Sequence, residues 1–286
     1  MISPHVRKLR LATEMRQLRA ASGLTADQLA KRIGRSRADI SRLENGHIVD
    51  QADVIRILDA LGVDGDRWTE VVTIAREAGE KGWWESHKMM GDRQALYANL
   101  EAGASTIRLY EQTFVPGLLQ IPEFVGARTS ATATLEPLSG TDEGVLDGRS
   151  GRQRMLRRPG GPTLAVIMDE VAVHRLAAPP DVVKKQLNHL ATVVNAEAKI
   201  TLRVLPVRAR ITDFTVPRCT FSIYTYPDPG DPQVVAIDTV TSDLLLTDPD
   251  QVTPYDRLYE RLWEAALPPE ESLNLLTRAA ADLSAA

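Results

Sequence analysis

Residues 25–46 read TADQLAKRIGRSRADISRLENG, and their spacing predicts two short helices joined by a tight turn. Leu29 falls on the buried side of the first helix, and Ile40 and Leu43 return at helical spacing on the second. Gly34 stands between the two helices, where the chain needs a residue that tolerates a positive φ. We therefore expect this stretch to fold as a helix-turn-helix.

Both helix starts carry capping signals that do not depend on the apolar spacing. Thr25 has Gln28 three residues later, and Ser36 has Asp39 three residues later, which is the spacing of a capping box. The second helix would then begin with a hydroxyl and unpaired backbone N–H groups. That arrangement suits a phosphate oxygen.

The outward face of the second helix is predicted to contact DNA. Burial of Ile40 and Leu43 leaves the opposite face polar and basic. A helix-turn-helix kept only as a packing or protein-binding module is the alternative, but it would not require these polar side chains to point outward together. The outward residues are Arg37, Ala38, Ser41 and Arg42, with Asn45 at the helix end.

Residues 7–62 resemble the DNA-binding domain of the phage-repressor-like, or XRE, family, whose pattern runs LR, GLT, LA, G, S, IS, LENG. The resemblance implies that the second helix of the motif enters the major groove of DNA, while residues at its two ends contact the DNA phosphate backbone. It also implies an ion pair between Arg19 and Glu44. Ala26 departs from the pattern, because the family usually has Gln there. The residues predicted to bind DNA are Thr25, Arg35, Ser36, Arg37, Ala38, Ser41, Arg42 and Asn45.

The charge of the chain is distributed unevenly. It carries 34 Lys and Arg against 38 Asp and Glu, a formal net charge of −4. Residues 1–62 nevertheless hold eleven of the basic residues and seven of the acidic ones, so this part is basic and the remainder acidic. Such a division is expected when only one end of a protein contacts phosphate.

Length and composition indicate about two soluble domains in the 286 residues. No apolar run is long enough to cross a bilayer, and the first ten residues are charged rather than signal-like, so we expect a cytoplasmic, nucleoid-associated protein. The single Cys219 permits no internal disulfide and makes a zinc finger implausible. No cofactor and no metal site are predicted.

The predicted fold class is mainly α, with an N-terminal five-helix domain followed by a larger α+β domain of mixed sheet and helices. The expected boundaries are 1–78 for the first domain, 79–84 for a linker and 85–286 for the second domain. In the second domain we expect a helix at 93–110, a loose connection at 129–141 and a basic helix at 143–158. Further helices are expected at 180–194, 248–266 and 268–283, and strands at 163–169, 198–206, 219–226, 233–238 and 242–247.

The second domain resembles the one that follows the repressor-like head in actinobacterial WhiJ-like, antitoxin-like regulators, through FVPGLLQIPEFV, RSGRQRMLRR and LAVIMDEVAVHR. This resemblance implies a small partner protein encoded nearby. We expect a homodimer held mainly by this domain. The basic helix has three interpretations: a solvated face, a surface for an acidic partner or anionic effector, or a flanking DNA contact. Its candidate partner- or effector-binding residues are Arg149, Arg152 and Arg154.

Motifs of the common enzyme classes are missing from the sequence. There is no GxSxG, Walker loop, HExxH or GxGxxG, so no catalytic residue is predicted. Asp169 and Glu170 form a carboxylate pair at a strand end, but a helix cap explains them better. The favoured hypothesis is a sequence-specific DNA-binding regulator with a sensing domain. An antitoxin-like protein that binds a small partner and autoregulates its operon is the alternative, and an enzyme with an unrecognised site is a third class.

Overall fold

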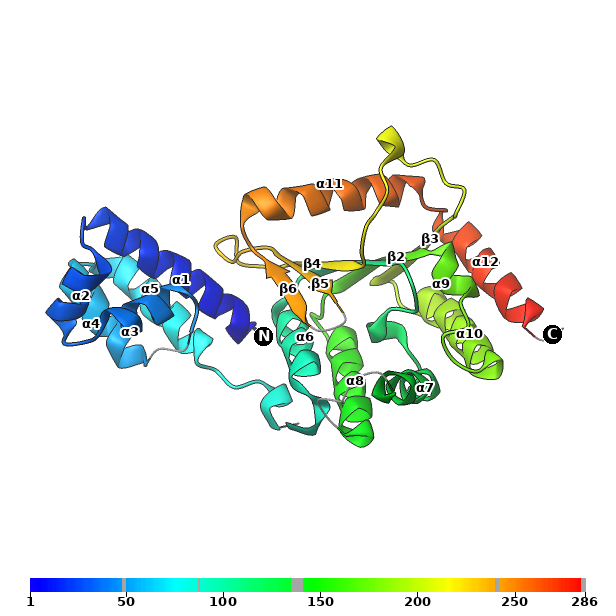
Figure 1. Cartoon of the computed structure of the whole chain (residues 1–286), viewed down its shortest axis with the longest axis horizontal. Helices are drawn as coiled ribbons and strands as arrows, with labels where there is room; N and C mark the ends of the chain where they lie inside the picture. The colour runs from blue at the N-terminus through cyan, green and yellow to red at the C-terminus, as the bar shows by residue number, and fades with distance from the viewer. Residues whose placement is uncertain (48–49, 87, 135–140, 240–241, 284–286) are drawn as a thin grey trace. The chain divides into compact units, whose positions relative to one another are not determined.

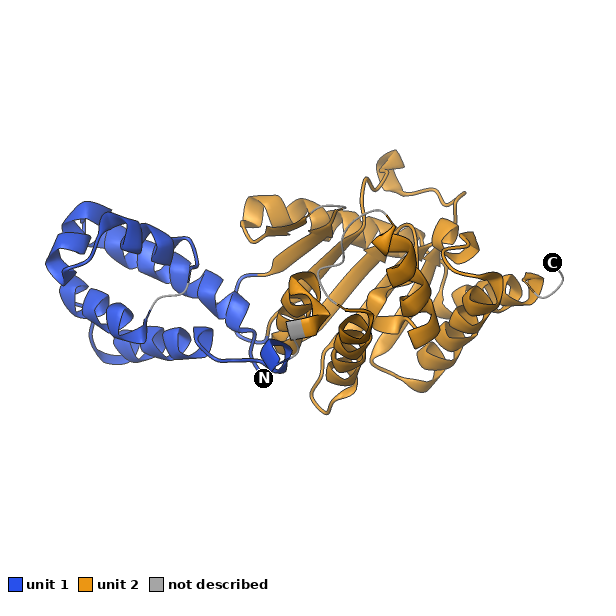
Figure 2. Cartoon of the chain, turned by 60° about the horizontal axis from the view of Figure 1, so that its bottom comes forward, with its two compact units in different colours: residues 1–86, 227–232 blue, residues 87–226, 233–286 orange. Residues whose placement is uncertain are grey.

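The computed structural model describes residues 1–47, 50–86, 88–134, 141–239 and 242–283. Its contacts divide the chain into two compact units (Figure 2). Unit 1 comprises Met1–Ser86 together with Pro227–Pro232, and unit 2 comprises His87–Tyr226 together with Gln233–Ala286. Unit 1 thus takes in a short segment from late in the sequence, in addition to the N-terminal residues.

Unit 1 is helical and encloses its own core. Its helices are α1 (Pro4–Ala21), α2 (Ala26–Ile33), α3 (Arg37–Glu44), α4 (Gln51–Leu61) and α5 (Gly65–Ala78), followed by the short η1 (Trp83–Ser86) (Figure 1). The side chains that fill the core come from all five α-helices, among them Met15, Leu29, Ile40, Leu58 and Val71. Because α2 and α3 supply only part of this core, α1, α4 and α5 hold the helix-turn-helix in place.

Unit 2 is built on a six-stranded mixed sheet in the order β3-β2-β1-β4-β5-β6. β1, β2 and β3 are parallel, whereas β4, β5 and β6 each run antiparallel to the preceding neighbour. The strands are β1 (Thr106–Glu111), β2 (Thr163–Asp169), β3 (Ile200–Leu205), β4 (Phe221–Thr225), β5 (Val234–Asp238) and β6 (Asp243–Leu246).

Helices cover both faces of this sheet. The longer ones are α6 (Asp92–Gly103), α7 (Pro122–Ala133), α8 (Asp142–Arg157), α10 (Pro180–Ala196), α11 (Pro249–Ala265) and α12 (Pro269–Asp282). Short helical turns are η2 (Lys88–Met90), η3 (Gly117–Leu119), α9 (Glu170–His174) and η4 (Thr212–Phe214).

The alternation of side chains along the strands separates the two faces. Tyr110, Ile167 and Phe221 pack with Tyr259 and Leu262 of α11 in one core cluster. The neighbouring strand residues point to the opposite face, which α6, α8 and α10 cover (Figure 1). The predicted fold class, a helical head followed by an α+β domain, is confirmed.

The prediction of one helix over residues 93–110 is wrong at its end. α6 stops at Gly103, and residues 106–111 form β1, which pairs with β2 in parallel and with β4 in antiparallel register. TIRLYE alternates apolar and polar residues, and long-range pairing decides its conformation. In the expected loose connection at 129–141, residues 129–133 belong to α7, and residues 135–140 lie outside the described residues.

Candidate DNA-binding surface

The turn between α2 and α3 has the geometry that its glycine predicts. Gly34 lies in the left-handed region at φ 66° and ends α2. The backbone N–H of Arg35 then donates to the carbonyl of Ala30 at 2.9 Å. An L-residue at position 34 would be strained by this backbone conformation, although a Cβ there would meet no atom within 4 Å.

Both predicted capping boxes are present. At α2, the Gln28 N–H donates to Thr25 Oγ1 at 3.2 Å, and the Thr25 N–H donates to Gln28 Oε1 at 2.9 Å. At α3, the Asp39 N–H donates to Ser36 Oγ at 3.2 Å, and the Ser36 N–H donates to Asp39 Oδ2 at 3.0 Å. The hydroxyl and N–H of Ser36 lower the pKa of Asp39, so this carboxylate is charged at the start of α3.

The inner side of α3 is fixed by apolar packing and by an ion pair. Ile40 and Leu43 are buried in the core of unit 1. Arg19 of α1 donates from Nη2 to Glu44 Oε2 at 2.8 Å, which is the pair that the phage-repressor resemblance implies. Arg16 adds a hydrogen bond from Nη2 to the carbonyl of Glu44 at 2.7 Å. The orientation of α3 is therefore set from its buried side.

The outer side of α3 carries the predicted contact residues. All eight residues predicted to bind DNA are exposed, namely Thr25, Arg35, Ser36, Arg37, Ala38, Ser41, Arg42 and Asn45. Residues 37, 38, 41 and 42 share one face, because 37 and 41, like 38 and 42, are four residues apart on a helix. Their exposure leaves this face accessible, while their role in binding stays a prediction.

The arginines on this surface differ in how firmly other side chains hold them. The Arg37 side chain is 73% exposed, and its Nη1 lies 4.0 Å from Asp27 Oδ2. Arg42 pairs with Asp39 one turn away. Arg35 pairs with Asp53 of α4, with 2.9 Å between Nη2 and Oδ1. Arg37 is thus the least constrained of the three.

Asn45 has a structural role in addition to its predicted one. It is the C-cap of α3, and its Nδ2 donates to the carbonyl of Ser41 at 2.7 Å. Its backbone N–H donates to the same carbonyl at 3.1 Å. A contact from Asn45 to a phosphate would therefore be made by a side chain that already closes the helix.

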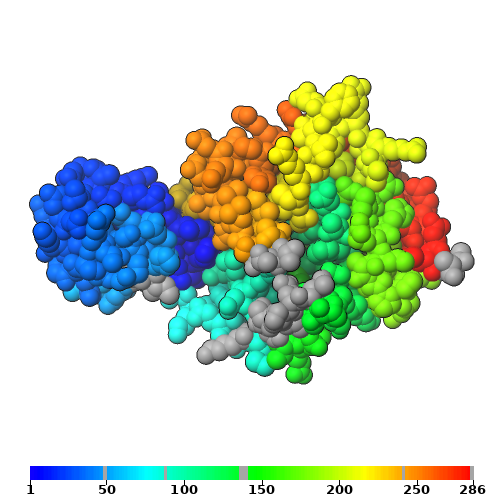
Figure 3. All heavy atoms as spheres, viewed as in Figure 1, coloured from blue at the N-terminus to red at the C-terminus, as the bar shows by residue number. Residues whose placement is uncertain are grey.

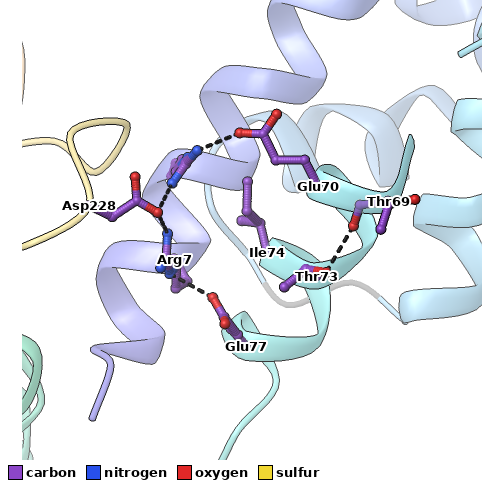
Figure 4. A pocket seen from close by; sticks show the side chains of 8 residues that line it. Arg7, Thr69, Glu70, Thr73, Ile74, Glu77 and Asp228 are labelled. Atoms are coloured by element: carbon purple, nitrogen blue, oxygen red, sulfur yellow. Dashed lines mark hydrogen bonds and ion pairs between the residues drawn. The ribbon is translucent and has the colours of Figure 1, made fainter. Parts of the chain in front are cut away.

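Sequence reasoning missed an ion-pair cluster on α1. Arg7 and Arg10 are both buried, and each donates to Asp228 Oδ2, Arg7 at 2.9 Å and Arg10 at 2.6 Å (Figure 4). Arg7 also donates to Asp231 Oδ1 at 2.8 Å and pairs with Glu77 of α5 at 2.8 Å. These bonds hold the segment Pro227–Pro232 on α1, beside a cavity of about 290 Å³ that α1 and α5 line.

The electrostatics of this cluster follow from its hydrogen bonds. Burial alone would raise the pKa of Asp228, but the Gly230 N–H, Arg7 and Arg10 lower that pKa to about 2. Asp231 behaves oppositely, since burial and the neighbouring Asp228 raise its pKa against the lowering effect of the two arginines. The only sequence signal was the acidic turn DPGD at residues 228–231, which is indistinguishable from an ordinary surface loop.

The structure corrects the prediction that Arg152 lies at a partner-binding surface. Arg152 is 6% exposed, and its Nε donates to Glu101 Oε2 of α6 at 2.8 Å. It also bonds to Gln94 of the same helix, so α6 satisfies its guanidinium inside unit 2. An arginine can occupy such a buried place when partners of this kind surround it.

The other two residues of the predicted basic site, Arg149 and Arg154, differ from Arg152 in burial. Arg149 is partly buried, its Nε has no hydrogen-bond partner in the described part of the chain, and its guanidinium lies against Gly117. Burial and the neighbouring Arg152 lower the pKa of Arg149 to about 9. Arg154 is exposed. The three arginines therefore do not form one surface.

Two further observations concern other classes of site. Within the parts of the chain that the structure describes, no three His, Cys, Asp or Glu side chains are placed together to bind a metal ion. None of the described helices is both long and apolar enough to span a membrane. Asp169 and Glu170, which resembled a catalytic pair, form the N-cap and first turn of α9, where Asp169 Oδ1 accepts the Val171 N–H at 2.9 Å.

Comparison with known families agrees with this geometry. Residues 10–70 match a helix-turn-helix domain family. Together with the arrangement of α2 and α3, this match places the protein in the class of helix-turn-helix DNA-binding regulators. Residues 94–278 match the family described as domain of unknown function DUF5753. This second match covers more than half of the chain, which therefore belongs to the DUF5753 family. No curated protein and no solved structure matches the chain.

Proposed function

We propose that this chain is a non-enzymatic transcription regulator of the phage-repressor-like class that recognises an operator in double-stranded DNA through α3. The observation that carries the proposal is the exposed face of α3, which combines Arg37, Ser41 and Arg42 opposite a buried apolar stripe. Arginine side chains of this kind recognise guanine edges in the major groove.

The proposed binding mode separates positioning from sequence recognition. The backbone N–H groups at the start of α3, together with Thr25, Ser36 and Arg35, would hold phosphates and fix the register. Arg37, Ala38, Ser41 and Arg42 would then face the bases, as in other helix-turn-helix proteins. Arg42 forms an ion pair with Asp39 in the unbound protein. To contact a base, Arg42 must either leave Asp39 or keep this pair and use its remaining N–H donors.

A single helix of this length contacts only a few base pairs. We therefore propose a homodimer that binds two half-sites about one helical turn apart, roughly 34 Å. Unit 2 would supply most of the dimer contact, since the apolar side chains of unit 1 fill its own core. The basic composition of residues 1–62 supports attraction to phosphate, and the proposed place of action is the nucleoid in the cytoplasm.

We further propose that unit 2 binds an effector or a partner protein. The alternative function is an antitoxin-like one, in which holding a small protein encoded nearby is the main task and DNA binding serves autoregulation. The resemblance of the second domain to antitoxin-like regulators, carried by FVPGLLQIPEFV, RSGRQRMLRR and LAVIMDEVAVHR, supports this alternative. Regulation requires the bound partner to favour one state of the DNA-binding unit over another, typically by about 1–3 kcal/mol.

Selection of duplexes from a randomised library by the intact chain tests the proposed DNA binding. We expect one enriched sequence with two related half-sites. Arg37→Ala should lose enrichment of particular bases, while Arg76→Ala, an exposed arginine of α5 outside the proposed surface, should select the wild-type sequence. The proposal fails if the intact chain enriches no sequence or if Arg37→Ala selects the wild-type site unchanged.

A further inference from the structure

Large apolar side chains of unit 2 gather on the connection between β3 and β4. In this connection, Val207 is 65% exposed, Phe214 is 78% exposed and Val216 is 74% exposed. Residues 207–218, here called the arm, rise from the sheet beyond α11 with η4 at the tip (Figure 1), and the space-filling view shows their atoms protruding (Figure 3). Side chains of this size are normally buried in a soluble protein.

The root of the arm is bonded to α9, which also carries exposed apolar side chains. The Val207 N–H donates to Glu170 Oε2 at 2.8 Å and so joins the arm to α9. Val171 and Leu176, on α9 and just after it, are also exposed. Five of the eight large apolar residues that are exposed in the described part of the chain therefore lie on the arm or at α9. Exposed apolar side chains gathered on neighbouring elements are typical of surfaces that bind other molecules.

The arm and the end of α9 also carry positive charge. Arg175, Arg208, Arg210 and Arg218 are exposed, and within the described ranges none of them forms an ion pair with a carboxylate. Arg210 lies over the ring of Phe214 at 5.3 Å. Two carboxylates of the arm and α9 are engaged: Asp213 pairs with Arg261 at 3.0 Å, and Glu170 holds the root of the arm.

The conformation of the arm tip is strained and is held from below. Asp213 and Phe214 have φ values of 56° and 52°, although neither is glycine. Two consecutive residues of this kind persist only where surrounding contacts fix them. Arg261 of α11 supplies those contacts, because its Nη1 donates to Thr215 Oγ1 at 2.7 Å and its Nη2 pairs with Asp213. The residues on either side of Phe214 are thereby tied to α11, and the Phe214 ring is exposed to solvent.

We propose that the arm and α9 form a docking surface for an acidic, amphipathic segment of a partner protein. Phe214 and the aliphatic side chains would bury the apolar side of that segment, and the four arginines would pair with its carboxylates. Aromatic and arginine residues are the types enriched where protein interfaces gain their affinity. The inference deepens the partner-binding role proposed for unit 2 and rests on it, but it does not depend on DNA recognition by α3.

A labelled model peptide tests the proposal on the intact chain. The probe is a fluorescein-labelled helical peptide with Leu along one face and Glu along the other, and fluorescence anisotropy measures its Kd. Phe214→Ser and Arg210→Glu should each weaken binding by at least about ten-fold, because each removes a central contact. Arg76→Glu makes the same charge change in unit 1 and should stay within about two-fold of wild type.

A second measurement tests the site without removing the ring, in case Phe214→Ser perturbs folding. A photo-crosslinking phenylalanine analogue at position 214 keeps the ring and should crosslink to the same peptide. Equal binding of a peptide with Lys in place of Glu would overturn the proposed charge complementarity. Loss of binding in Arg154→Glu but not in Arg210→Glu would overturn the location by moving the site to α8.

Two other occupants of the surface give distinct results. If Phe214→Ser converts a dimer into a monomer in sedimentation, a second copy of the chain occupies the arm and the proposal is wrong. If Arg210→Glu abolishes binding to a random duplex while the peptide never binds, the surface contacts nucleic acid. Operator binding measured on the same samples separates this proposal from the proposed DNA recognition. Variants of the arm should still bind the operator. If the wild-type chain binds the peptide but not the operator, the proposed role of α3 is wrong and the docking surface is unaffected.

Discussion

At the scale of single residues, local ion pairs determine how available each side chain is for a new contact. Arg42 and Arg35 are held by Asp39 and Asp53, whereas Arg37 has only a 4.0 Å approach to Asp27. Recruiting Arg37 to a base therefore disturbs little in the unbound protein. We expect Arg37 to contribute more to sequence recognition than Arg42.

Arg152 and Arg154 stand two residues apart, yet their replacement should affect stability very differently. Arg152→Ala leaves the carboxylate of Glu101, itself 3% exposed, without its charged partner, so the free energy of unfolding should fall by about 3–5 kcal/mol. Arg154→Ala removes an exposed side chain and should change it by no more than about 0.5 kcal/mol. Urea unfolding monitored by circular dichroism measures both. Equal effects would contradict the buried pair.

The same residues show which local features a sequence can predict. The capping boxes at Thr25 and Ser36 join residues three apart, and both were predicted because their partners are visible in the sequence. Arg152 was predicted to be accessible, since a basic helix normally faces solvent. Its partner Glu101 is 51 residues away, and only the packing of α6 against α8 brings the two together.

At the scale of elements, α1 does more than fill the core, because it also holds the segment Pro227–Pro232 through Arg7 and Arg10. Both arginines are buried, so their charges depend on the carboxylates around them. Loss of one of those carboxylates would leave a positive charge poorly compensated. The stability of unit 1 should therefore respond to the protonation of this segment.

The pH dependence has a definite sign. The pKa of Asp228 is lowered from 3.8 to about 2, so its contribution to stability is complete above the ordinary pKa and is lost as the pH falls through the lowered one. Between about pH 4 and about pH 2 the free energy of unfolding of wild type should fall more steeply than that of Asp228→Asn. Asp181→Asn, at an exposed aspartate of α10, is the control and should follow wild type. Parallel curves for Asp228→Asn and wild type would exclude the linkage.

β1 shows why one element was missed while most were found. The helices of unit 1 and the strands at 163–169 and 198–206 carry strong periodic patterns and end at turn residues, and the structure contains them. TIRLYE follows a helix without a proline or a long loop. Its partner residues lie at Thr163 on β2 and Thr225 on β4, so no local pattern records the pairing. The segment Pro227–Pro232 was assigned with its sequence neighbours for the same reason.

At the scale of the whole molecule, the proposal requires two copies of α3 on one operator. Sedimentation of the intact chain should give a dimer at micromolar concentration, and hydroxyl-radical footprints should protect two regions about one helical turn, roughly 34 Å, apart. A monomeric intact chain that protects a single region would contradict this assembly.

The central claim is that α3 recognises bases while its ends position the DNA backbone. Its most direct test is the affinity of wild type, Arg37→Ala and Asn45→Ala for the selected operator and for every single base-pair change within one half-site. We predict that Arg37→Ala costs about 1–3 kcal/mol on the operator and loses preference at one or two base pairs, whereas Asn45→Ala weakens all duplexes alike. If Arg37→Ala weakens every duplex equally and keeps the wild-type preferences, α3 does not recognise the sequence through this arginine.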